Sequence, residues 1–311
     1  MIRKWAAYFV LILGTLVGAL SVAYAGHVEN GDARKPIQFG LTAVVVRENL
    51  RFLDQWSQYL SEKIGHPVEF VRRKSYREVM DLLDSGRIDF AWICGYPFIE
   101  KRDPEFIQLL SVPVYAGRPL YHSFIIVHKD SPYRTIEDLE DKVFAFSDPE
   151  SNSGYLFPQF LLASQGKTLE GHFRQTFFTY SHAETVEAVA EQVANGGAVD
   201  SYIWEYLNDK RPALVGKTRV IQKSPAFGFP PVVARIGADP KMVQKMKDVL
   251  LGMSNDLEGK KFLAGLKLDG FGDSPPELFD SIRDMAAKTR KALPWATAAE
   301  RKKNEMAAGK E

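Results

Sequence analysis

The segment VFAFSDPESNSGYLFPQFLLA, residues 143–163, joins an apolar run typical of a strand to an apolar run typical of a helix through a polar loop. The loop, residues 147–154, is rich in Ser, Asn and Gly. The first N–H groups of a helix have no partner inside it and lie at its positive end, so this junction is suited to holding an anion. A capped helix start that binds nothing is the structural alternative.

The rest of the chain alternates between strand and helix patterns in the same way. Ser75, with Glu78 three residues later, forms a capping box that marks a helix start. The β-α-β-α-β order up to Cys94 indicates a parallel sheet with right-handed crossovers, and therefore an α/β fold. The predicted strands are residues 37–41, 68–71, 89–94, 123–128, 143–146, 173–178, 200–204 and 232–236. The predicted helices are residues 48–65, 75–85, 155–163, 183–194, 240–253 and 276–287.

The N-terminus has the features of an export signal. Arg3 and Lys4 precede an uncharged apolar run over residues 5–22, and residues 23–25 (Ala-Tyr-Ala) form a small-x-small cleavage site. Cleavage there predicts a periplasmic protein that begins at Gly26 and has no stable membrane insertion. An uncleaved anchor is the alternative, because the run is about long enough to span a bilayer. No Cys follows the run directly, so a lipid anchor is not indicated.

Length and charge limit the class of protein. About 285 residues remain after cleavage, which suits two lobes of roughly 100–150 residues each. Once Arg3 and Lys4 are removed, 38 basic residues stand against 39 acidic ones, so the mature chain is close to neutral. A nucleic-acid surface needs a clustered basic excess, so we expect no nucleic-acid partner.

The loop Asp148-Pro149-x-Ser151-x-Ser153-Gly154-Tyr155-Leu156-x-Pro158 resembles the signature loop of the periplasmic phosphonate, phosphite and phosphate-binding proteins, the solute receptors of ABC importers. Residues 53–68 (Leu-x-x-Trp-x-x-Tyr-Leu-x-x-x-x-Gly-x-Pro-Val) and residues 75–91 (Ser-Tyr, then Gly-x-x-Asp-Phe-Ala) resemble the same family in order and spacing. The resemblance runs from about residue 38 to residue 200. It implies a two-lobed periplasmic binding protein of type II, the Venus-flytrap type, in which each lobe is a mixed, mainly parallel sheet flanked by helices.

The expected organisation follows from this fold. We expect a signal peptide at 1–25, lobe one at 26–122 and 229–295, lobe two at 123–228, and a charged tail at 296–311. The anion-binding loop spans residues 147–158. Two chain crossings between the lobes suit a hinge, in which a few residues absorb domain closure.

The resemblance also implies which residues surround the ligand. The family usually has Thr where this chain has Asn152, a substitution that either weakens or tunes oxyanion binding. His182 follows the predicted N-cap Ser181, with Glu184 completing a second capping box, and the family carries a His there that hydrogen-bonds the phosphonate. A solvated surface His is the alternative. The residues so placed are Ser151, Asn152, Ser153, the backbone N–H groups of Gly154 and Tyr155, and His182.

Three further residues are candidates for the ligand site. Tyr121 at the chain crossing and Tyr96 each offer a phenolic donor on an apolar body, although most tyrosines serve packing. The third candidate is Asp200, because relatives in the family can have carboxylates in this part of the chain that recognise an amine on the ligand. The alternative is that Asp200 is a structural residue at the start of a strand. Relatives often have a polar or aromatic residue where this chain has residues 44–46 (Val-Val-Val).

The sequence does not favour an enzyme. Ser153, His182 and Asp200 occur in the order of a triad, but this Ser is not in a Gly-x-Ser-x-Gly elbow. The sequence contains no His-x-x-x-His, Cys cluster or Gly-x-Gly-x-x-Gly motif. We therefore expect a binding protein without catalytic residues, metal or cofactor. Its ligand is a small phosphorus oxyanion, and its partner is an inner-membrane ABC permease.

Cys94 supports an alternative function. It is the only cysteine, and it follows an apolar strand. A buried small hydrophobe is the usual role of such a residue. One subgroup of the family senses arsenite and signals to a membrane histidine kinase, and it has a Cys in a segment similar to residues 94–98 (Cys-Gly-Tyr-Pro-Phe). A thiolate suits trivalent arsenic better than a phosphorus oxyanion.

Overall fold

The structure is a computed structural model that describes residues 35–42, 50–101 and 106–292. The predicted signal peptide, the charged tail and residues 44–46 lie outside the described residues. The described chain from Pro36 onward belongs to one compact unit. Within these ranges, none of the helices is both long and apolar enough to cross a membrane.

The first sheet has the strand order β13-β4-β12-β3-β1-β2 among the described residues. β1 runs parallel to β2 and to β3, as the β-α-β-α-β order predicts. β12 returns antiparallel between β3 and β4, which makes the sheet mixed. The strands are β1 Ile37–Leu41, β2 Val68–Arg72, β3 Phe90–Trp92, β4 Ile107–Val114, β12 Val232–Arg235 and β13 Gly270–Gly272.

The second sheet has the order β10-β6-β9-β7-β8 in the described chain. β7 is parallel to β8 and β9, whereas β6 is antiparallel to β9 and β10. Two short strands, β5 Leu120–Tyr121 and β11 Phe227–Gly228, pair with each other where the chain passes between the sheets. The other strands are β6 Ser123–His128, β7 Val143–Phe146, β8 Gln175–Phe178, β9 Gly196–Asp200 and β10 Thr218–Lys223.

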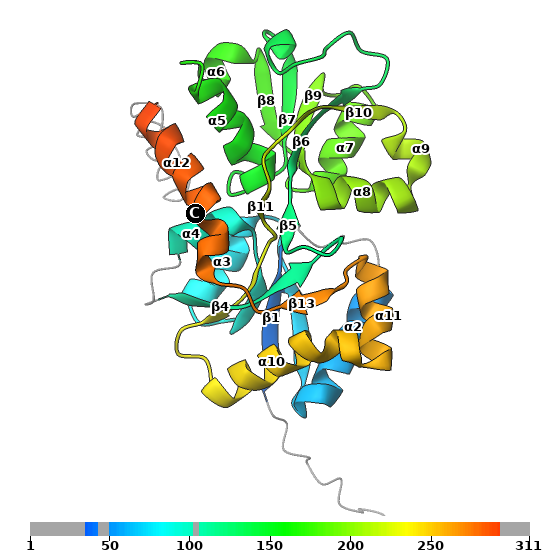
Figure 1. Ribbon diagram of the computed structural model, residues 1–311, viewed down its shortest axis with the longest axis vertical. Helices are drawn as coiled ribbons and strands as arrows, with labels where there is room; N and C mark the ends of the chain where they lie inside the picture. Colours follow the sequence, from blue (N-terminus) through cyan, green and yellow to red (C-terminus); the bar gives the residue numbers. More distant parts are fainter. Residues whose placement is uncertain (1–34, 43–49, 102–105, 293–311) are drawn as a thin grey trace, which may run out of the picture. The chain divides into compact units, whose positions relative to one another are not determined.

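Helices flank both sheets, which confirms the α/β fold with two mixed sheets. α2 and α10 pack beside the first sheet, and α7 and α8 beside the second (Figure 1). α12 contacts both α4 and α5. The helices are α2 Leu50–Ile64, α3 Tyr76–Asp84, α4 Gly95–Lys101, α5 Phe157–Ala163, α6 Leu169–His172, α7 His182–Ala190, α8 Ser201–Lys210, α9 Pro212–Val215, α10 Pro240–Gly252, α11 Leu257–Leu266 and α12 Asp280–Ala292, with short turns at Glu137–Leu139, Asn152–Leu156, Met253–Asn255 and Pro276–Phe279.

The predicted helix starts depend on side-chain caps that the structure contains. Ser75 and Glu78 form the reciprocal capping box of α3. Ser181 caps α7 by accepting a hydrogen bond from the backbone N–H of Glu184. The second predicted capping box is only half formed in the described chain, because the Ser181 N–H donates to Thr179 Oγ1 at 3.3 Å instead of to the Glu184 side chain. Each cap satisfies an N–H group that the helix itself leaves without a partner.

The strand predicted at residues 200–204 is wrong. Asp200 is the last residue of β9, and its side chain accepts hydrogen bonds from the N–H groups of Tyr202 and Ile203 at the start of α8. Asp therefore acts as an N-cap, and the apolar residues that follow it have helical spacing. β4 and β10 were not predicted either. The predicted lobe boundaries remain predictions.

The core of the first sheet is rich in aromatic side chains. Trp56 on α2 is fully buried and lies edge-on to Trp92 of β3, with ring centroids 6.2 Å apart. Phe70 of β2 contacts the same Trp56 ring at 5.0 Å. The indole N–H of Trp92 donates to the carbonyl of Pro230 at 2.9 Å, so the ring is also fixed to the chain before β12.

Replacement of Trp56 by Ala tests this packing. We expect Trp56→Ala to lower the free energy of unfolding by about 3–5 kcal/mol, because it leaves a large cavity between α2 and the sheet. Urea denaturation followed by circular dichroism measures the change. Leu257→Ala is the control, since Leu257 is 83% exposed and its loss should alter stability by less than about 0.5 kcal/mol. Equal stability of the two variants would show that Trp56 does not pack in the core between α2 and the first sheet.

Candidate functional site

Seven buried polar side chains gather where strands of the two sheets end. Two of them lie in the first turns of α3 and α7, and two lie in the loop after β7. The other three lie directly before α4, on β5 and at the end of β9. Ligands in α/β proteins bind at the carboxyl ends of parallel strands, which is where most of these residues lie. We call this set the polar cluster: Tyr76, Cys94, Tyr121, Asn152, Ser153, His182 and Asp200, all buried.

The loop after β7 leads into a single π-helical turn, Asn152–Leu156, which directly precedes α5. Ser151 caps it, with Oγ accepting from the Gly154 N–H at 2.9 Å and its carbonyl accepting from the Tyr155 N–H at 3.2 Å. The predicted donors Gly154 and Tyr155 therefore use these N–H groups inside the loop. Only Gly fits at 154, since a Cβ there would lie 2.6 Å from the Cβ of Ser147.

His182 uses both ring nitrogens in contacts with the protein. The backbone N–H of Asp200 donates to Nδ1 at 3.1 Å, and Ser147 Oγ lies 2.8 Å from the same atom. Burial lowers the pKa of His182 to about 3, so the imidazole is neutral. Because Nδ1 accepts from a backbone N–H, the ring proton is assigned to Nε2.

The proton on Nε2 determines the role of Tyr76. Tyr76 Oη lies 3.2 Å from His182 Nε2 and therefore accepts its hydrogen. The hydroxyl keeps its own hydrogen, since burial raises the pKa of Tyr76 well above the usual tyrosine value. Tyr76 is thus a neutral donor held in place by His182.

Tyr76 was not predicted as a site residue. A usable signal was present, because Tyr76 directly follows the N-cap Ser75 after strand β2. His182 follows Ser181 after β8 in the same way, and that position was the reason to select it. Two helix first turns after parallel strands therefore point to the same region.

Cys94 is linked directly to the loop after β7. Its Sγ accepts the backbone N–H of Asn152 at 3.3 Å, and hydrogen bonding from the Tyr96 N–H and the Tyr121 hydroxyl favours the thiolate form. Burial raises the pKa of Cys94 to about 11 despite these hydrogen bonds. Tyr96 contributes this backbone group to the cluster and is itself half-buried on α4.

Two buried atoms of the loop have no hydrogen-bond partner within the described ranges: Asn152 Oδ1 and Ser153 Oγ. Asn152 Nδ2 donates to Tyr121 Oη at 2.9 Å, which holds the amide in place. Ser123 Oγ donates to the carbonyl of Ser153 at 2.6 Å and fixes the backbone there. Buried polar atoms are normally paired, so these two indicate a place for a ligand group.

One carboxylate belongs to the polar cluster and two others adjoin it. Asp200 Oδ1 accepts from the N–H of Tyr202 at 2.7 Å, yet burial raises the pKa of Asp200 to about 7. Asp148 Oδ2 accepts the N–H of Tyr76 at 3.0 Å, which joins the loop of the second sheet to α3 beside the first. Burial, and next the charge of Asp148, raises the pKa of Glu150 to about 7.

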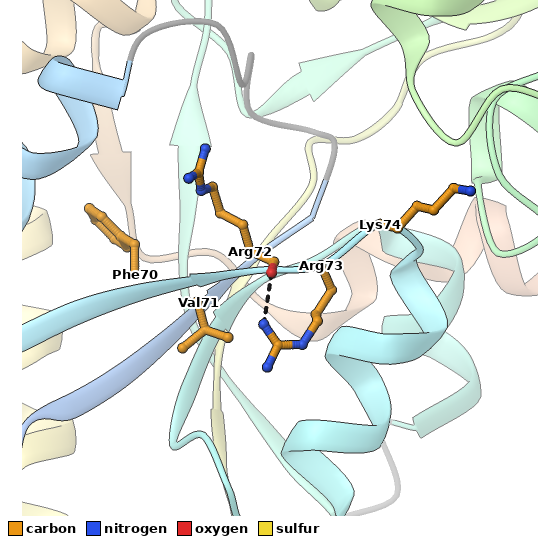
Figure 2. A pocket seen from close by; sticks show the side chains of 5 residues that line it. All are labelled: Phe70, Val71, Arg72, Arg73 and Lys74. Atoms are coloured by element: carbon orange, nitrogen blue, oxygen red, sulfur yellow. Dashed lines mark hydrogen bonds between the residues drawn. The ribbon is translucent and has the colours of Figure 1, made fainter.

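A separate cavity of about 640 Å³ lies at the end of β2 and is lined by residues 70–74 (Figure 2). Arg72 and Arg73 extend in different directions from the strand, and Arg73 Nη1 donates to the Arg72 carbonyl at 2.8 Å. Lys74 Nζ lies 5.4 Å from the ring centroid of Tyr180, which belongs to the second sheet's side. None of the predicted site residues lines this cavity, but its cations lie close in sequence to Tyr76 and favour anions nearby.

The described part of the chain contains no group of three or more His, Cys, Asp and Glu residues arranged to hold a metal ion. The donors of the cluster are hydroxyl, thiol, amide and backbone N–H groups. Such donors suit an oxyanion, because they offer hydrogen bonds without a charge of their own.

Two mixed α/β sheets joined by a short strand pair, with a buried polar cluster between their strand ends, define the class of two-lobed solute-binding proteins. The model of the family described as "ABC transporter, phosphonate, periplasmic substrate-binding protein" matches residues 39–278. The chain belongs to this family of periplasmic binding proteins, which are not enzymes.

Individual relatives agree with the family. The phosphonates-binding periplasmic protein of Escherichia coli K12 is 26% identical over 268 residues, covering 84% of this chain and 78% of the relative. The binding protein component of an ABC phosphonate transporter from Pseudomonas aeruginosa is 25% identical, with a TM-score of 0.78 over 83% of this chain and 88% of its own. PhnD1 from Prochlorococcus marinus in complex with methylphosphonate has the same fold, with a TM-score of 0.71, 20% identity, and coverage of 83% and 99%.

The buried state of Cys94 predicts slow thiol chemistry. Only the thiolate reacts, and a pKa near 11 leaves about one thiol in a thousand ionised at pH 8. We expect Ellman's reagent to label the native protein at least about 100-fold more slowly than the protein unfolded in urea. The unfolded chain is the internal reference, because Cys94 is the only cysteine. Similar rates in both states would show that the thiol is exposed.

Proposed function

We propose that the polar cluster binds a phosphorus oxyanion, with methylphosphonate and phosphite as the main candidates, and that the loaded protein delivers it to an inner-membrane ABC permease. The observation that carries this is the pair of unpartnered buried atoms, Asn152 Oδ1 and Ser153 Oγ, in the family's signature loop. The relatives named for phosphonates support the same ligand class.

The cluster can hold an oxyanion through neutral donors. Ser153 and Tyr76 supply hydroxyl hydrogens, and His182 acts through Tyr76 by donating to its oxygen. Neutral donors discriminate between ligands by the number and position of their hydrogens, since a mismatched buried group loses about 1–3 kcal/mol. Binding of this kind involves no bond-making step.

Closure of the lobes contributes to the same site. Cys94 and Tyr76, on the first sheet's side, contact Asn152 and Asp148 in the loop after β7. A ligand held by Ser153 and Tyr76 therefore adds to contacts that already join the two sides. The closed form then presents the surface that the permease recognises, as in hinge closure generally.

A second function is supported by the position of Cys94. Its Sγ contacts the backbone N–H of Asn152, next to the two unpartnered loop atoms. A soft sulfur at that point suits trivalent arsenic, with the Ser153 hydroxyl as an oxygen partner. Under this alternative the protein is an arsenite sensor whose partner is a membrane histidine kinase.

Replacement of Ser153 by Ala tests the oxyanion site. We expect Ser153→Ala to weaken binding of methylphosphonate or phosphite by about 1–3 kcal/mol, because the ligand loses a buried donor. Isothermal titration calorimetry of the protein from Gly26 onward measures the change. Ser131→Ala is the matched control, since Ser131 Oγ is also buried without a partner in the described structure but lies in the loop after β6. Unchanged affinity in Ser153→Ala would place the site elsewhere.

Cys94→Ser separates the two functions. We expect phosphonate binding to survive this substitution within about threefold, because the serine oxygen can still accept the Asn152 N–H. Arsenite binding, if present in the wild type, should be lost with the sulfur. Titration with phosphate, phosphite, methylphosphonate, 2-aminoethylphosphonate and arsenite gives both results. Arsenite binding alone in the wild type would replace the importer function with the sensor function.

A further inference from the structure

The amide of Asn152 has a defined orientation. Its Nδ2 donates to the Tyr121 hydroxyl oxygen at 2.9 Å. Asn152 Oδ1 therefore faces away from Tyr121, is buried, and has no partner among the described residues. An amide oxygen is an acceptor only.

Two hydroxyl groups of the polar cluster differ from this atom in one respect. Ser153 Oγ and Tyr76 Oη carry hydrogens, and each can donate one to a ligand oxygen. Asn152 Oδ1 has none. An ionised ligand oxygen opposite Oδ1 would bring two acceptors together in a buried site, which leaves both unpaired. A ligand oxygen that carries a hydrogen would satisfy Oδ1.

The charge around the cluster favours the same form of ligand. The fully buried charged side chains near it in the described structure are carboxylates, Asp148 and Asp200, and no Lys or Arg is buried among the described residues. A second negative charge on the ligand would therefore meet repulsion at short range without a buried cation to offset it.

We propose that Asn152 selects an oxoacid that retains a hydroxyl hydrogen, so that this protein binds the monoanion of a phosphonate or phosphite in preference to the dianion. The ligand P–O–H donates to Asn152 Oδ1, while Ser153 and Tyr76 donate to its unprotonated oxygens. The inference rests on the proposed oxyanion function and specifies the protonation state of its ligand.

The pH dependence of binding tests this selection. We expect the dissociation constant for methylphosphonate to rise about tenfold per pH unit above the ligand's second pKa, because the binding form becomes scarce. Difluoromethylphosphonate has a lower second pKa, since fluorine withdraws electrons, and its affinity should begin to fall at a correspondingly lower pH. Calorimetric titration between about pH 5.5 and about pH 8.5 measures both curves.

Two ligands are needed because the protein has groups that titrate in this range. The groups that face Asn152 or adjoin its loop are Tyr76 on α3, Cys94 before α4, Tyr121 on β5, Asp148 and Glu150 in the loop, His182 on α7 and Asp200 on β9. Burial brings the pKa of both Glu150 and Asp200 to about 7. Titration of either group would start the loss of affinity at the same pH for both ligands.

Asn152→Thr is the informative variant, because a threonine hydroxyl rotates and can donate or accept. We expect it to bind the dianion as well and to reduce the loss of affinity between pH 6 and pH 8.5 by about tenfold or more. Ser131→Ala should keep the wild-type curve. Three results would each overturn the proposed selection. The loss of affinity could begin at the same pH for both ligands, the wild-type affinity could be independent of pH, or Asn152→Thr could show the same pH dependence as the wild type. Absence of binding by either phosphonate at every pH would instead reject the oxyanion function itself.

Discussion

The hydrogen bond from the Asp200 backbone N–H to His182 Nδ1 determines the direction of hydrogen bonding from His182 to Tyr76. A backbone N–H can only donate, so Nδ1 must accept and the hydrogen of this neutral ring lies on Nε2. Tyr76 then accepts from the ring and keeps its own hydrogen for another partner. Because Asp200 is fixed by the pairing of β9 with β6, opposite Ser123, the sheet itself sets the direction of these hydrogen bonds.

The same cluster joins the two sheets. The N–H of Asn152 donates to Cys94, and the N–H of Tyr76 donates to Asp148, so hydrogen bonds run in both directions between the two sides. Both contacts use the loop after β7, whose shape is set by the Ser151 cap and by the glycine at 154. The contacts between the two sheets therefore depend on the shape of this one loop. The burial of Cys94 also explains why this protein tolerates a single free thiol outside the cytoplasm, because burial raises the pKa of Cys94 and keeps the thiol unreactive.

Much of the fold was predictable because its signals are local. The capping box at Ser75 and the strand–helix order of the first sheet follow from residues close together in sequence. The strand predicted at 200–204 failed for a local reason as well, because Asp200 caps a helix whose apolar residues also suit a strand. β4 and β10 were missed, and both pair with strands distant in sequence, such as β12 and β6.

The candidate site was less predictable than the fold, and the difference has a physical origin. Sequence patterns place Asn152, Ser153 and His182 at strand ends, but they do not assign the hydrogens. That assignment comes from contacts such as Asp200 to His182 and Asn152 to Tyr121, between residues 18 and 31 positions apart in the chain. Selectivity in a site of neutral groups depends on which atoms donate and which accept. The selection proposed for Asn152 therefore depends on an unpaired amide oxygen that only the three-dimensional contacts identify.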